Sequence, residues 1–417
     1  MNKIQKTPKD QVRKRPATKA LDWIHIRRAS KTLHEALLDA WTCTRAGHLR
    51  HSVKLFVETQ MANDNVRMDI AILCHSTEKS TGKVDILHLQ VRPALMVITS
   101  SPRLFLPGSG NDKRPRKRLK SVRFSDDSAD VGYEPSEQPA SYSLAQTNSH
   151  SVDLRCAGDI CHTFATYCGQ KSVANCLGHI DIASDESYRH QFFAASRSLV
   201  HFSDPSAIEP DHLISMDAVI ADQTRDSFST IDKLRMAKAL VLAVLKFHAT
   251  PWLREAWRLQ DLAFFQYCQD LTRSLRTLHL GVDFNHGASE PLDNKSTTAD
   301  DMSLLASRSP LSQVSEDERL LCGINNLTLH CLGVALLQID RLRSIEPDEV
   351  LTVRKMAKSS SSLGPKYRQL TEQCLRCDFA YGTDLSKPQL QKAVYESVVD
   401  VLESMIAVLD INDDEDD

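Results

Sequence analysis

The chain has 417 residues, enough for two domains or one large unit, and its net charge of −3 with 25% charged residues is ordinary for a soluble protein. This balance gives no overall attraction to nucleic acid or to a membrane surface. Because the sequence has no apolar run of about eighteen residues and does not begin with a signal-peptide core, we expect a cytoplasmic or nuclear protein with no membrane partner.

The first part of the sequence predicts a basic arm and then a small antiparallel sheet. Residues 1–28 are basic and carry no clear periodicity, so we expect a disordered arm. Thr32 and Glu35 form a capping box ahead of an apolar helix that reaches Trp41. Three stretches of alternating apolar residues then predict strands: 51–60, 66–75 and 84–98. We group residues 29–99 as a small β-rich N-lobe.

Residues 100–150 differ in composition from both neighbours, since Pro, Gly, Ser, Asp, Lys and Arg dominate and large apolar residues are rare. We expect a disordered basic insertion. Its central run has six basic side chains within eight positions: Lys113, Arg114, Arg116, Lys117, Arg118 and Lys120. In a disordered segment such a run serves as a nuclear-import element, as a patch for an acidic partner, or only as a solubilising charge run.

The residues that follow the basic run have the form of a type-1 phosphatase docking motif. Lys120, Val122 and Phe124 are spaced so that an added extended strand would place the valine and the phenylalanine in two apolar pockets. Phosphate on Ser121, beside the valine, would put a double negative charge at a dry interface. We therefore expect protein partners, namely a type-1 phosphatase and an import receptor. A nucleic-acid partner is disfavoured because no reading helix or finger accompanies the basic run.

Helical periodicity dominates residues 151–410, which we group as a helical C-lobe, and residues 411–417 form an acidic tail. One strand is expected at 175–180. Helices are expected at 153–168, from 187 onward, and at 229–248, 315–339, 348–358 and 386–405.

The eleven cysteines are scattered and often lie beside apolar residues, which favours buried thiols over a disulfide framework. Cys374 and Cys377 have the spacing of half a zinc site, but no second pair of ligands follows nearby in the sequence. Cys156, Cys161 and His162 are the nearest alternative set. We expect no metal and no other cofactor.

The most informative stretch is 229–266. Apolar residues recur there at three- and four-residue spacing from Ile231 onward, and the helix that they predict ends at Pro251. Trp252 and a strand-like run at 261–265 follow closely. This order of helix, turn and strand resembles the middle of a protein-kinase C-lobe, where it delivers the catalytic loop.

Four further blocks occur in order along the chain: Leu33–Cys43, Cys176-Leu177-Gly178, Phe247–Leu253, and Cys374–Phe379 with Ala393–Val399. Together they resemble a fungal domain family of unknown function, often found behind a HeLo-like, prion-inhibition-type N-terminal domain. The resemblance covers about residues 30–410. The family in turn looks like a degenerate protein kinase.

Phosphotransfer requires a glycine-rich loop, a strand lysine, a catalytic Asp and metal-holding side chains. The resemblance puts Asp261 at the catalytic Asp and Asp283 at the metal-binding Asp, but Gln266 replaces the usual Asn and Thr328 the usual Asp of the central helix. The sequence before residue 100 has no glycine-rich loop. We therefore interpret Asp261 as a carboxylate satisfied by backbone donors, and His248 likewise as a helix-terminal cap.

These patterns predict an α+β, bilobed fold of degenerate protein-kinase type, with a small antiparallel β N-lobe and a mostly helical C-lobe. The expected function is that of a non-catalytic, pseudokinase-like interaction or regulatory protein, and the resemblance implies fungal self/non-self or stress signalling as the setting. One alternative is an atypical phosphotransferase that uses Asp261 and Asp283 with a strand lysine, Lys54 or Lys83. A second is a nucleic-acid-associated nuclear factor that binds through 113–120.

Overall fold

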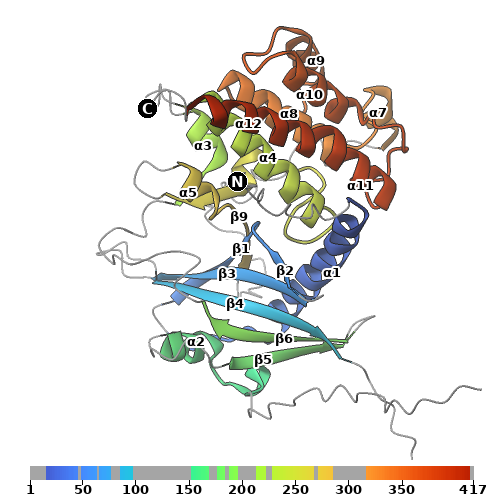
Figure 1. Cartoon of the computed structure of the whole chain (residues 1–417). Helices are drawn as coiled ribbons and strands as arrows, with labels where there is room; N and C mark the ends of the chain where they lie inside the picture. The colour runs from blue at the N-terminus through green and yellow to red at the C-terminus, as the bar shows by residue number, and fades with distance from the viewer. Residues whose placement is uncertain are drawn as a thin grey trace, which may run out of the picture. The chain divides into compact units, whose positions relative to one another are not determined.

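The structure is a computed structural model of the whole chain (Figure 1). It describes the following residues: 16–45, 48–62, 65–76, 85–96, 152–168, 176–183, 187–195, 213–221, 228–266, 271–284 and 316–413. The described fold combines an antiparallel sheet with helices, so the predicted α+β class is confirmed.

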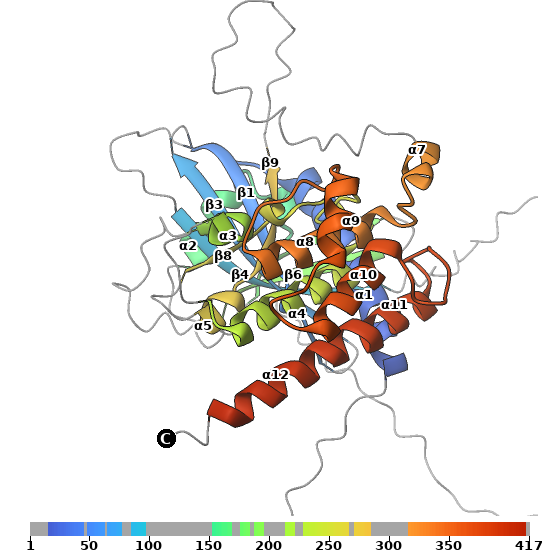
Figure 2. The same ribbon diagram turned by 90° about the horizontal axis from the view of Figure 1, so that it is seen from above.

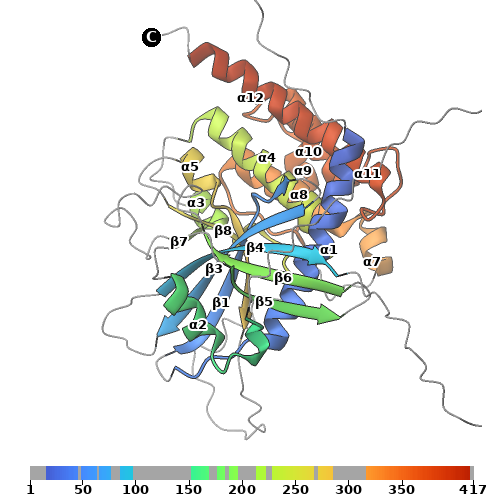
Figure 3. The same ribbon diagram turned by 60° about the horizontal axis from the view of Figure 1, so that its bottom comes forward.

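The sheet joins strands from distant parts of the chain in the order β5-β6-β4-β3-β1-β9-β8-β7, with β2 paired to β3 beside this path. Every strand pairing is antiparallel. Figure 3 shows β5, β6 and β4 side by side. The strands are β1 (His48–Phe56), β2 (Gln60–Ala62), β3 (Asn65–Ser76), β4 (Asp85–Leu95), β5 (Cys176–Ala183), β6 (Ser187–Ala194), β7 (Leu213–Ser215), β8 (Leu262–Phe265) and β9 (His279–Phe284).

One face of this sheet carries the main core. Val53 of β1 pairs with Ile72 of β3, and Ile70 of β3 pairs with Leu89 of β4, so alternate apolar side chains lie on the same face. All four are fully buried. Helices α1 (Pro16–Ala40) and α2 (Ile160–Cys168) pack against strands of the sheet. The alternating pattern of the sequence therefore positions this half of the fold.

The helical part is built around α4 (Thr230–Phe247) and α8 (Leu327–Arg341), which pack on each other. The other helices of this part are α3 (Met216–Ala221), α5 (Leu271–Leu275), α7 (Glu316–Leu321), α9 (Val350–Lys358), α10 (Pro365–Arg376), α11 (Pro388–Val394) and α12 (Asp400–Asp413), with the 3-10 turn η2 (Leu259–Asp261). The 3-10 turn η1 (Leu154–Cys156) lies against β5 of the sheet. A π-helical turn (Tyr395–Val399) joins α11 to α12, and α12 lies along α4 (Figure 2).

Helix α1 links the sheet to the helical part. It packs against β5 and β6 on one side and against α4 and α11 on the other (Figure 1). The guanidinium of Arg27 donates to the carbonyl oxygen of Leu245 at 2.6 Å and to Gln391 Oε1 at 3.1 Å. Residues 16–28 therefore differ from the disordered arm that was expected there, because Trp23 and Ile26 bury large apolar side chains in the core.

The sheet also crosses the boundary that the sequence placed between two lobes. β9 and β8 come from the stretch 151–410, yet β9 pairs along six residues with β1 of the stretch 29–99. All described residues fall in one compact unit rather than in an N-lobe and a C-lobe. The sequence suggested two lobes because local periodicity contains no information on pairing between strands more than two hundred residues apart.

Local structure differs from prediction at several further places. The helix expected at 153–168 is reduced to the turn η1 and the helix α2, with a break at 157–159. The helix expected from Ser187 is wrong: these residues form β6, in which Tyr188, His190 and Phe192 alternate inward. The single helix expected at 315–339 is broken into α7 and α8, and Asn326 caps the second helix by accepting from the backbone N–H of Leu329. Among the described helices, none is long and apolar enough to cross a membrane.

Candidate functional site

The loop that follows α4 is held by buried side chains. His248 Nδ1 lies 2.9 Å from the carbonyl oxygen of Val244, and burial lowers the pKa of His248 to about 4, so the neutral ring donates to the end of its own helix. Trp252 Nε1 donates to the carbonyl oxygen of Ser30 at 2.8 Å. Trp257 Nε1 donates to that of Thr328, on α8, at 3.2 Å. These residues anchor the loop structurally, and His248 caps the helix as its position in the sequence suggested.

Asp261 serves as a local cap. It ends the turn η2, and its Oδ2 accepts from the backbone N–H of Arg258 at 2.8 Å. The next residues enter β8, whose Leu262 pairs with Leu280 of β9. The carboxylate that the resemblance puts at the catalytic position is thus engaged by backbone, in agreement with the interpretation from sequence.

Asp283 lies on β9 and has different neighbours. Its Oδ2 accepts from the guanidinium of Arg50 at 2.9 Å, and both side chains are more than one-third exposed. Lys54 of β1 pairs with Gly281, and Ser52 with Asp283, so Lys54 and Asp283 share one face of the sheet. Burial lowers the pKa of Lys54, whereas the charge of Asp283 raises it. The structure therefore brings Asp283 and one of the two candidate lysines to one face.

Glycine at position 281 lets the Lys54 side chain lie close to the backbone of β9. A Cβ built there would lie 2.7 Å from Lys54 Nζ, so any side chain would displace the ammonium group. The second candidate lysine, Lys83, lies outside the described residues. So do all residues of the basic run and of the phosphatase motif: Lys113, Arg114, Arg116, Lys117, Arg118, Lys120, Val122 and Phe124.

A basic pocket of about 340 Å³ opens between α4, α5 and α12. Its cations are Arg235, Lys238, Lys246 and Arg276. Arg235 pairs with Asp410 at 2.9 Å and Lys238 with Glu403 at 3.1 Å. Lys246 Nζ donates to the carbonyl oxygen of Val57 at 2.8 Å, and burial lowers the pKa of Lys246 to about 8. Three of the four cations thus already stabilise contacts within the chain.

The metal ligands weighed in the sequence do not come together. Cys374 and Cys377 are buried at the end of α10, where the Cys377 thiol lies 3.7 Å from the carbonyl oxygen of Gly382. Cys156 is exposed on η1, and His162 Nδ1 lies 3.1 Å from the guanidinium of Arg45. Neither of these two sets of candidate ligands therefore forms a metal site.

Cys161 instead lies beside Cys43, His48 and His51. Sequence reasoning missed this group because Cys161 is more than a hundred residues from its neighbours. The local signal was the spacing Cys43-x4-His48-x2-His51, which brings three metal-binding side chains into nine positions.

Comparison with known proteins identifies a family for the larger, C-terminal part of the chain. A search of curated proteins finds no match. The family pattern of a domain of unknown function, DUF7580, matches residues 138–408, which is more than half of the chain. The chain therefore belongs to the DUF7580 family of domains of unknown function.

Proposed function

We propose that this protein is a non-catalytic interaction or regulatory protein whose helical part follows a degenerate protein-kinase plan. The order of α4, the tryptophan loop, β8, β9 and α8 supports the resemblance to a kinase C-lobe. The bond from Trp257 to α8 supports it further, because a central helix that holds the catalytic loop is part of that plan.

The pairing of β1 with β9 carries the non-catalytic part of the proposal. In a kinase the lysine contacts the phosphates of the nucleotide, and the metal-binding Asp holds the Mg²⁺ ions, so the nucleotide lies between the two side chains. Here the strands that carry Lys54 and Asp283 are hydrogen-bonded neighbours, which places their backbones only about 4.8 Å apart. The two side chains project from the same face of a continuous ladder, so they do not face each other across a triphosphate.

The test is thermal unfolding of the full chain with and without millimolar ATP, in Mg²⁺ and in Mn²⁺. A ligand that binds the folded state at a hundredfold excess over its Kd adds about 2.7 kcal/mol of stability, which is readily seen as a rise in Tm. We expect no rise. A rise that Asp283→Ala abolishes, and that the surface variant Asp410→Ala retains, would overturn the non-catalytic assignment.

A rise in Tm that depends on Asp283 would favour an atypical phosphotransferase that uses Asp261 and Asp283. One observation supports this alternative: Lys54 and Asp283 share a face, and their charges interact. Phosphate transfer to a generic protein substrate, lost in Lys54→Met, would then be the decisive measurement.

We propose that protein partners bind this chain through the segment 113–124. Its chemistry fits a type-1 phosphatase and an import receptor, and fungal signalling remains the setting that the family resemblance implies. The phosphatase catalytic subunit should bind the full chain, and replacement of both Val122 and Phe124 by Ala should weaken binding at least about tenfold, since two apolar anchors are lost. Arg114→Ala is the charge control. Equal binding by all variants would refute the docking motif.

A further inference from the structure

Two thiols and two imidazoles converge at the junction of three elements. Cys43 follows the end of α1, His48 and His51 lie on β1, and Cys161 lies in the first turn of α2. One ligand atom from each side chain can be chosen so that all four lie within 4.8 Å of one another. His51 and Cys161 are buried, whereas Cys43 and His48 are partly exposed.

The three distances from His48 Nδ1 to the other ligand atoms have the values of a tetrahedral metal site. Cys43 Sγ lies 3.5 Å from His48 Nδ1, Cys161 Sγ lies 3.4 Å from the same atom, and His51 Nε2 lies 3.3 Å from it. With Zn–S near 2.3 Å and Zn–N near 2.05 Å, a tetrahedron requires sulfur-to-nitrogen separations of about 3.6 Å and nitrogen-to-nitrogen separations of about 3.3 Å. The three observed separations agree with these values.

The donor chemistry also fits. Two thiolates and two neutral imidazoles form a neutral complex with Zn²⁺, which removes the cost of a buried net charge. Without a metal, burial raises the pKa of the Cys43 thiol to about 11. A hydrogen bond in which the protonated Cys161 thiol donates to Cys74 Sγ, together with burial, raises the pKa of Cys161 still further. A divalent cation would replace these protons and give the four groups a common partner.

The surroundings hold the ligands in place. The backbone N–H and the hydroxyl of Thr44 both donate to Asp159 Oδ2, at 2.9 and 2.7 Å, and so fix the Cys43 loop to the start of α2. Cys74 Sγ lies 3.6 Å from Cys161 Sγ, where its thiol can donate to a metal-bound thiolate. The ring of Trp41 lies 5.2 Å from that of His51.

We propose that Cys43, His48, His51 and Cys161 form a structural Zn²⁺ site that ties the end of α1 and the start of β1 to α2. Four protein ligands leave no open coordination position, so the ion stabilises the fold rather than activating water. Tetrahedral coordination by two sulfur and two nitrogen atoms selects zinc over the oxygen-preferring Mg²⁺ and Ca²⁺.

The first experiment measures metal in the purified full chain after incubation with Zn²⁺ and removal of the excess. We expect one tightly held zinc ion per chain, and Co²⁺ in its place should give visible ligand-field bands and a thiolate-to-cobalt charge-transfer band. Cys43→Ser and Cys161→Ser should lose both signals. Cys156→Ser, which changes an exposed cysteine on the neighbouring turn η1, should keep them. Cys74→Ala should retain the cobalt spectrum but weaken zinc binding about tenfold.

Since a ligand variant can lose its fold, the unchanged protein provides the second readout. A mercurial reagent that caps thiolates should release zinc in proportion to the thiols modified, and a chelator should lower Tm. Folded protein that takes up no zinc, and whose Tm does not respond to it, would overturn the site. So would a disulfide between Cys161 and either Cys43 or Cys74 in folded, metal-free protein.

Discussion

Gly333 lies in the middle of α8, where glycine is normally unfavourable. Replacing a mid-helix glycine by alanine usually stabilises a protein by about 1 kcal/mol. At this position a Cβ would lie 2.6 Å from Leu375 Cγ and 2.9 Å from the backbone nitrogen of Leu375 on α10. Because the backbone of α10 cannot move without losing its packing, we expect Gly333→Ala to destabilise the protein by about 1–3 kcal/mol.

Urea unfolding measures this effect as a lower midpoint at unchanged slope. Gly158→Ala is the matched control, since a Cβ at Gly158 meets no atom within 4 Å. A neutral or stabilising Gly333→Ala would mean that α8 and α10 pack less closely than described.

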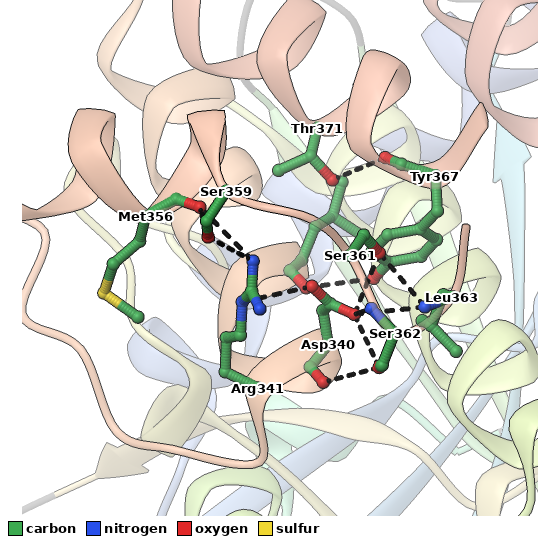
Figure 4. Close-up of polar contacts among 10 residues, drawn as sticks. Asp340, Arg341, Met356, Ser359, Ser361, Ser362, Leu363, Tyr367 and Thr371 are labelled. Atoms are coloured by element: carbon green, nitrogen blue, oxygen red, sulfur yellow. Dashed lines mark hydrogen bonds and ion pairs between the residues drawn. The ribbon is translucent and has the colours of Figure 1, made fainter. Parts of the chain in front are cut away.

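Asp340 lies in the last turn of the same helix and is buried, and its carboxylate oxygens have hydrogen-bond and ion-pair partners (Figure 4). Its Oδ1 accepts from the Ser361 hydroxyl and from the hydroxyl and backbone N–H of Ser362, at 2.8 to 2.9 Å, while Oδ2 lies 3.3 Å from Arg341 Nε. The carboxylate therefore orders the loop before α10.

Asp340→Ala should cost about 3–5 kcal/mol, because it leaves buried donors and a partly buried guanidinium without their acceptor. Asp410→Ala also removes a carboxylate paired with an arginine, but its side chain is 48% exposed, so the loss should stay below about 1 kcal/mol. Similar losses in the two variants, measured by urea unfolding, would contradict the role given to burial.

At the scale of elements, burial strongly lowers the pKa of a histidine on each of three strands: His88 on β4, His190 on β6 and His279 on β9. Burial lowers their pKa values to about 4, 3 and 3. In the unfolded chain these groups bind protons below their ordinary pKa of about 6.5, whereas the folded sheet keeps them neutral. Their contribution to stability is present above pH 6.5 and is lost as the pH falls toward 4.

Each such histidine adds up to about 1.4 kcal/mol per pH unit to the slope of stability against pH in that window. His190→Gln keeps a partner for the Thr32 hydroxyl, which lies 3.1 Å from His190 Nε2. It should reduce the slope of stability against pH by the contribution of about one bound proton. His25→Gln, at an exposed position on α1, is the control. The measurement is the urea midpoint between about pH 7 and pH 5, and an unchanged slope in His190→Gln would contradict it.

Elements were predictable where a local pattern decides them. The stretches 51–60 and 66–75 became β1 and β3, and the three- and four-residue spacing after Ser229 became α4. Ser187–Ala194 was mistaken for a helix because a short run with three aromatic residues fits either period, and only pairing with β4 and β5 selects the strand.

At the scale of the whole molecule, long-range pairing decides both the sheet and the candidate sites. Local periodicity predicts neither the pairing of β1 with β9 nor the contact between Cys161 and His48. The charge and apolar patterns therefore predicted the class of fold, whereas the sites depended on contacts between segments separated by more than a hundred residues.

The same long-range contacts make a prediction about unfolding. A bilobed chain with a weak interface would lose its sheet and its helical part in separate steps. Here the ladder of β1 with β9 runs through the sheet, and α1 contacts both parts, with Trp252 Nε1 bonded to the carbonyl oxygen of Ser30. We expect one cooperative transition, since neither part keeps its hydrogen bonds without the other.

Two tryptophans allow the two parts to be followed separately. Trp41 contacts the rings of His51 and Phe284 on the sheet, and Trp257 contacts α8. Because the chain also contains Trp23 and Trp252, both are first replaced by phenylalanine. In that background, phenylalanine at Trp41 or at Trp257 leaves one tryptophan, which reports on the other part. In urea, the fluorescence midpoints of Trp41→Phe and Trp257→Phe should each equal the far-ultraviolet circular dichroism midpoint of the same variant. If the fluorescence of either part changed at a lower urea concentration than the circular dichroism, the ladder between β1 and β9 would not couple the two parts, and the sheet would be two separate sheets in solution.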